Sequence, residues 1–105
     1  RGGGDMRGIV IDPGANPELY RLPDTLQELQ RFMGGYAQRC PIDNNFAALF
    51  YLPQAGQSLP TRHYQGRWFY GRLCLVGWRN ARMTDLPMPL AEELLQKFTP
   101  VEVTP

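Results

Sequence analysis

The chain has 105 residues, a net charge of +1, 43% hydrophobic and 20% charged residues, a composition that predicts one folded domain and excludes global disorder. No apolar run approaches the ~20 residues that a membrane-spanning helix needs. We therefore expect a cytoplasmic protein without a cofactor. In that compartment, Cys40 and Cys74 are expected to be reduced thiols buried in apolar stretches.

Two strands are expected at the start of the chain. Residues 1–5 are glycine-rich, and we interpret them as a cloning remnant or a disordered leader ahead of a single α+β domain at 6–105. Residues 8–11 are apolar and largely β-branched, which favours a strand, and an Asp-Pro-Gly turn sequence follows them. A second strand at 19–22 is expected to return beside the first, before a proline interrupts the pairing.

A helix is predicted at 25–33. Thr25 and Glu28 have the spacing of a capping box, in which the two side chains satisfy free amides of the first turn. Apolar residues recur at helical spacing on one face: Leu26, Leu29, Phe32 and Met33. The pair of glycines at 34–35 supplies a left-handed stop.

The middle of the chain predicts a hairpin followed by a loop. Residues 36–42 and 46–52 read as two antiparallel strands, because the Asp-Asn-Asn sequence at 43–45 tolerates the positive φ of a tight turn. Residues 53–67 contain two prolines and two glycines without apolar periodicity. They are expected to form a long loop without secondary structure.

The longest apolar run, residues 68–78, is expected to be the central strand, with Gly71 and Gly77 marking a bulge or a close backbone approach. A closing helix of about ten residues is predicted from Pro89 onward, because the apolar residues after it have helical spacing. These residues are Leu90, Leu94, Leu95 and Phe98. The expected fold is therefore α+β, with a small, mostly antiparallel sheet of about four to five strands packed by two amphipathic helices.

Several motifs in this order resemble a known family: Ile9-Val10-Ile11-Asp12-Pro13, then Leu26-Gln27-Glu28-Leu29-Gln30 leading into Gly34-Gly35-Tyr36, and later Tyr70-Gly71 and Val76-Gly77. The chain resembles an uncharacterised family of small bacterial proteins associated with phages and mobile elements, domain of unknown function family 3846. Gln38 departs from the acidic residue that relatives tend to have there. The resemblance implies a phage or mobile-element accessory protein that interferes with a host process, and it assigns no catalytic residue.

Enzyme motifs are absent from the sequence. His63 is the single histidine, and Ser58 lacks the flanking glycines of a nucleophile elbow. Asp12, Glu18 and Asp24 could together bind a hard cation, but turn and helix-cap roles explain the two aspartates more simply. We expect no metal site, no catalytic residue and a non-catalytic function.

The charge distribution points to a candidate binding segment. No acidic residue occurs between Asn44 and Thr84, whereas five of the ten arginines lie there among aromatic residues. Arginine binds carboxylates and phosphates with a planar fork and stacks on rings. The candidate binding residues are Arg62, His63, Tyr64, Arg67, Arg72, Trp78, Arg79 and Arg82.

These residues leave two hypotheses open. The first is that the segment 62–82 binds a protein partner, through arginine and aromatic side chains. The alternative is that it binds nucleic acid or a phosphorylated small molecule. Against both stands an ordinary mixed surface, in which the aromatics belong to the core and the arginines pair with acids elsewhere. A homo-oligomer formed through an exposed strand edge is a further open possibility.

Overall fold

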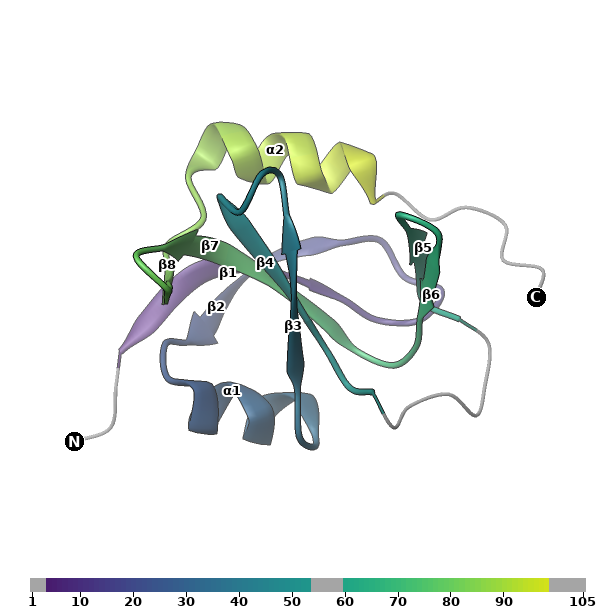
Figure 1. The fold of residues 1–105 in the computed structure, drawn as a ribbon, viewed down its shortest axis with the longest axis horizontal. Coiled ribbons are helices and arrows are strands. Elements are labelled where there is room, and N and C mark those ends of the chain that lie inside the picture. The colour runs from purple at the N-terminus through teal and green to yellow at the C-terminus, as the bar shows by residue number, and fades with distance from the viewer. Residues whose placement is uncertain (1–3, 54–59, 99–105) are drawn as a thin grey trace.

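The computed structural model describes residues 4–53 and 60–98 and has a six-stranded antiparallel sheet at its centre (Figure 1). The predicted α+β class is confirmed. Across the sheet, the strands follow the order β2 (Glu18–Pro23), β1 (Asp5–Ile11), β7 (Leu73–Arg79), β4 (Ala47–Tyr51) and β3 (Gln38–Ile42), and β8 (Arg82–Thr84) pairs with the end of β7. The sequence predicted that the central strand lies within residues 68–78, and this central position is confirmed for β7.

The central strands are buried on both faces. On β7, Leu73 and Leu75 belong to one apolar cluster, whereas Cys74 and Val76 belong to the other, and all four are 0% exposed. Successive side chains of a strand point to opposite faces, so the two clusters lie on opposite sides of the sheet. This double burial explains why the strand reads as a continuous apolar run instead of an alternating one.

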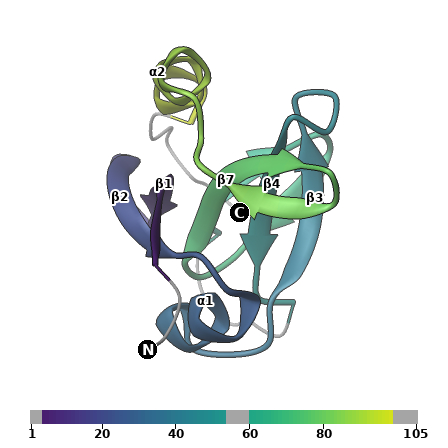
Figure 2. The same cartoon turned by 90° about the vertical axis from the view of Figure 1, so that its left-hand side faces the viewer.

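One helix covers each face of the sheet, as the two views show (Figures 1 and 2). α2 (Met88–Lys97) packs on the face of Leu75 through Ala91 and Leu94, and α1 (Leu26–Met33) packs on the opposite face through Leu29 and Met33. Neither of these helices is long and apolar enough to cross a membrane.

Thr25 and Gly34 cap α1 as predicted, whereas the Glu28 side chain pairs with Arg31 and not with the Thr25 amide of the predicted capping box. The Thr25 hydroxyl accepts a hydrogen bond from the Glu28 amide (3.3 Å), and Gly34 adopts the left-handed conformation with φ 98°. The carboxylate of Glu28 binds Arg31 at 2.8 Å. Leu26 differs from the rest of the predicted apolar stripe, because it is 47% exposed.

The two early strand pairs also agree with the sequence. β2 runs antiparallel to β1, which begins at Asp5, three residues before the predicted start and within the segment we had set apart. β3 and β4 form the predicted hairpin, and the three residues of its turn, Asp43, Asn44 and Asn45, all have positive φ. Short polar side chains tolerate this conformation better than most residues do.

Two predictions for the later part of the chain were wrong. Residues 53–67 do not form one loop, because β5 (Arg62–Tyr64) and β6 (Arg67–Phe69) make a small separate hairpin around Gln65 and Gly66, both with positive φ; residues 54–59 lie outside the described part. The expected strand at 68–78 is two strands, because the chain turns at Gly71 (φ 75°) between β6 and β7. The Gln-Gly pair was the overlooked turn signal.

Gly77 marks a close backbone approach, as the sequence predicted. A Cβ atom at this position would collide with the backbone carbonyl of Asp85, which follows β8. We expect Gly77→Ala to lower the free energy of unfolding by about 2 kcal/mol or more, because the backbone carbonyl cannot move aside without disturbing the sheet.

Gly35 offers a matched control for this substitution. A Cβ atom there would meet only the Leu52 side chain at 3.7 Å, so Gly35→Ala should change stability by less than about 0.5 kcal/mol. Urea unfolding of the two variants checks the prediction. Equal effects of the two substitutions would contradict it.

The two cysteines are free and lie on opposite faces of the sheet. Cys40 is half-buried and packs against the cluster under α2, whereas Cys74 is fully buried under α1. Burial raises the pKa of the Cys74 thiol to about 12. In the folded protein at pH 8, iodoacetamide should therefore modify Cys40 and leave Cys74 unmodified, since only the thiolate reacts. Peptide mass spectrometry measures both positions, and equal labelling of the two would contradict the burial of Cys74.

Candidate functional site

Arg62, the first candidate binding residue, lies in the interior and is 2% exposed. Its guanidinium donates to three backbone carbonyls: Phe98 at the end of α2 (2.9 Å), Thr61 (2.6 Å) and Ala15 in the β1–β2 connection. Burial lowers the pKa of this guanidinium. Arg62 therefore connects the β5–β6 hairpin to two other parts of the fold and is not available on the surface.

Removing this buried donor should be costly. Arg62→Met keeps most of the side-chain volume but leaves three carbonyls without their donor, so we expect the free energy of unfolding to fall by about 2–4 kcal/mol. Arg67→Met, at an exposed site in the same hairpin, should cost less than about 1 kcal/mol. Urea unfolding compares the two, and a similar loss in both variants would contradict the structural role of Arg62.

His63 and Tyr64 lie on the two sides of the β5–β6 hairpin. His63 is exposed and opposes Trp68 across the strand pair, with 4.6 Å between the ring centroids. Tyr64 is half-buried, 5.4 Å from the ring of Phe98, and burial is the main cause that raises the pKa of its hydroxyl. Tyr64 therefore contributes to packing, and His63 to an exposed ring pair.

Arg67 and Arg72 both interact with other side chains of this protein. The Arg67 guanidinium lies over the rings of Tyr51 (4.9 Å) and Phe69 (4.8 Å). Arg72 binds both carboxylate oxygens of Asp12, at 2.7 and 3.1 Å, and this hydrogen bonding raises the pKa of the guanidinium. Asp12, in the first third of the chain, thus neutralises one positive charge of the acid-free segment.

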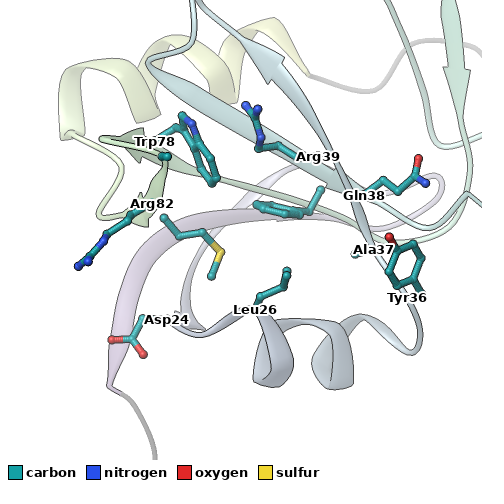
Figure 3. A pocket seen from close by; sticks show the side chains of 11 residues that line it. Asp24, Leu26, Tyr36, Ala37, Gln38, Arg39, Trp78 and Arg82 are labelled. Carbon is teal, nitrogen blue, oxygen red and sulfur yellow. The ribbon is translucent and has the colours of Figure 1, made fainter.

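A groove of about 770 Å³ opens on the face of the sheet that carries α1, and we call it the α1 groove (Figure 3). Phe50 of β4, Trp78 of β7 and Met83 of β8 line it from the sheet. Leu26 of α1 and Tyr36, which follows the helix, line its other side and are 47% and 60% exposed. This volume falls in the range of ~300–1,000 Å³ that is typical of ligand sites.

Trp78 makes two ring contacts at the α1 groove. The guanidinium of Arg39 lies 4.3 Å from the centroid of its ring, and the ring of Phe50 lies 6.3 Å away. The register of the sheet pairs Arg39 on β3 directly with Phe50 on β4, so these two side chains share one face of the sheet. Arg39 therefore places a positive charge at the edge of an apolar surface.

Arg79 and Arg82 lie together on the β7–β8 hairpin. The register opposes them directly, across a two-residue turn in which Asn80 and Ala81 have φ values of 52° and 59°. Both arginines line a second depression of about 500 Å³, which shares Arg82 and Met83 with the α1 groove. The α1 groove and this depression therefore meet at Arg82 and Met83. Arg79 lines only the second depression, because the alternation that places Trp78 on the α1 face turns Arg79 to the opposite face.

The arginines of this surface lack acidic partners within residues 4–53 and 60–98. The ion pairs in these ranges join Arg31 to Glu28 and Arg72 to Asp12, and none involves Arg39, Arg79 or Arg82. Asp24 is the acidic residue among the described groove-lining residues, and it lies at the end near the start of α1 (Figure 3). The surface therefore carries an excess of positive charge.

The structure divides the predicted set into separate groups. Trp78, Arg79 and Arg82 come together at the β7–β8 end of the sheet, whereas the candidates on β5 and β6 lie at the opposite end (Figure 1). Sequence reasoning missed Arg39, Leu26 and Tyr36. Arg39 lies outside the acid-free segment, and Leu26 has the same helical spacing as the buried residues of α1. Nothing in the sequence therefore marked either of them as a binding residue.

The three carboxylates weighed for a cation site, Asp12, Glu18 and Asp24, do not form a metal-binding group in the described ranges. Asp12 binds Arg72, and no group of three or more His, Cys, Asp or Glu side chains with metal-ligand geometry occurs within the described ranges.

No family model, curated protein or solved structure matches this chain. The α1 groove is therefore interpreted from its own geometry.

Proposed function

We propose that this protein is a non-catalytic binding protein, whose α1 groove takes a segment of a partner protein. The observation that carries the proposal is the Trp78 side chain, held beside Arg39 and Phe50 at the apolar floor of an open groove. Tryptophan and arginine are the residue types that contribute most often to protein–protein binding energy.

The exposure of apolar side chains supports this function. Leu26 and Tyr36 remain 47% and 60% exposed, although each borders a floor of Phe50, Trp78 and Met83. A partner side chain inserted here would remove several apolar groups from water at once, at roughly 25 cal/mol per Å² of apolar surface. Arginines at the edge of an apolar centre give the groove the arrangement of a protein interface.

The alternative of nucleic-acid binding through the whole segment 62–82 has less support. That proposal needs arginines that converge on a phosphate backbone. Arg62 donates to carbonyls in the interior and Arg72 binds Asp12. Of the remaining arginines of the segment, Arg67 lies on the separate β5–β6 hairpin, far from Arg79 and Arg82 on the β7–β8 hairpin (Figure 1).

The resemblance to proteins of phages and mobile elements gives this binding function a biological setting. In that setting, the partner is a host protein, and occupation of the α1 groove interferes with the process in which that protein takes part. An accessory protein of this kind needs a binding surface and no catalytic group.

A pair of leucine variants tests the function of the groove. Leu26 is the first residue of α1, where a carboxylate is favourable for the helix dipole, so Leu26→Glu should leave the fold intact while placing a charge beside the apolar floor. Leu19, 42% exposed on the edge strand β2, is the control for the same substitution. Short random peptides displayed on yeast are selected for binding to the wild-type protein.

We expect the selected peptides to bind wild type and Leu19→Glu equally and Leu26→Glu at least about tenfold more weakly, since a buried charge without a partner costs more than 1.4 kcal/mol. Thermal unfolding confirms that both variants are folded. Peptides that bind all three proteins equally would overturn the assignment of the α1 groove.

A further inference from the structure

We infer that the segment bound by the α1 groove is acidic: a peptide in which a large apolar side chain is flanked by carboxylates that engage Arg39 on one side and Arg82 on the other. The inference rests on the proposed function and specifies the chemistry of the partner. The apolar floor selects the apolar side chain of the peptide, and the two arginines select the charge of the residues beside it.

The first argument is the excess of positive charge around the groove. Within residues 4–53 and 60–98, Arg39, Arg79 and Arg82 form no ion pair, while Arg31 and Arg72 each bind a carboxylate of this chain. Carboxylates of a partner in the groove would form charge-assisted pairs with Arg39 and Arg82. Such complementarity of charge selects the partner and accelerates the encounter.

The second argument is the repulsion inside the β7–β8 hairpin. Arg79 and Arg82 are directly opposed in the register, and like charges at directly opposed positions destabilise a strand pair. A Glu at either position would relieve the repulsion in the free protein. A carboxylate of a bound segment relieves it too, so the repulsion adds to the affinity for an acidic partner.

The third argument is the placement of the charges relative to the anchor site. Arg39 lies beside Trp78 on the β3 side of the groove, and Arg82 lines the β8 side (Figure 3). The second depression continues from Arg82 to Arg79. A segment whose apolar side chain occupies the floor between β3 and β8 therefore meets a guanidinium in both directions.

A peptide fits these features better than nucleic acid does. The Trp78 ring already stacks with Arg39, which leaves that ring face unavailable for a base. The floor of the groove is formed by Phe50, Trp78 and Met83, which favours an apolar side chain over a sugar–phosphate chain.

Charge reversal tests the inference with the same yeast-displayed library of random peptides. Arg39→Glu/Arg82→Glu reverses two charges at the groove, and Arg21→Glu/Arg67→Glu reverses two exposed charges outside it. The two double variants have the same net charge. Circular dichroism and thermal unfolding verify that each is folded.

We expect wild type and the control double variant to select peptides with Asp or Glu around an aliphatic or aromatic residue. The groove double variant should bind those peptides at least about tenfold more weakly and should itself select peptides with Lys or Arg at the same positions. If the selected peptides lose binding to Leu26→Glu but are not enriched in Asp or Glu, the inference is wrong and the proposed function still holds.

Two other outcomes would reject an acidic peptide as the partner. If no peptide bound in a manner sensitive to Leu26→Glu, the proposed function would fail together with the inference. Single-stranded and duplex oligonucleotides are assayed in parallel. Oligonucleotide binding that depends on Arg39 and Arg82 and weakens steeply with salt, without any peptide binding, would replace the acidic peptide by nucleic acid.

The repulsion within the hairpin has its own test in the free protein. Arg79→Glu converts the opposed arginines into an opposite-charge pair, so it should raise the Tm by a few degrees and weaken binding of the selected acidic peptides. An unchanged or lower Tm would overturn the argument from repulsion. Arg67→Glu, which also reverses one exposed charge but lies opposite the uncharged Tyr64 in its strand pair, is the single-charge control.

Discussion

The fold depends on one strand that is buried on all sides. β7 is paired along both edges, with β1 and β4, and the four residues at its start are 0% exposed. A strand without a solvent-exposed face requires a covering layer on each side of the sheet. α1 and α2 supply these layers, and the Arg62 guanidinium connects the end of α2 to the small hairpin beside it. The two helices are thus a consequence of the apolar composition of β7.

The α1 groove exists because α1 is short. Eight residues give a helix of about 12 Å, which covers Met6, Val10 and Val76 through its buried residues but leaves the far end of β7 open. Trp78 emerges there, directly after Gly77, whose missing side chain lets the chain after β8 pass close to the backbone. The exposed Leu26 has the same origin. It lies on the side of α1 that faces this open end of the sheet (Figure 3).

Four arginines show three physical roles, which their sequence does not distinguish. Arg62 donates to carbonyls in the interior, Arg72 neutralises Asp12, and Arg39 and Arg82 line an apolar groove without acidic partners in the described ranges. The guanidinium suits all three roles because its planar donors bind carbonyls and carboxylates and its faces stack on rings. Only the last group gives the protein an interaction surface.

The sequence by itself determined the elements with local signals: the caps of α1 at Thr25 and Gly34, the polar turn at 43–45 and the apolar run of β7. These signals act between neighbours, so they can be read without the fold. The break at Gly71, the burial of Arg62 and the meeting of Arg39 with Trp78 were decided only by the tertiary structure. They depend on strand order and register, which bring together residues that are distant along the chain.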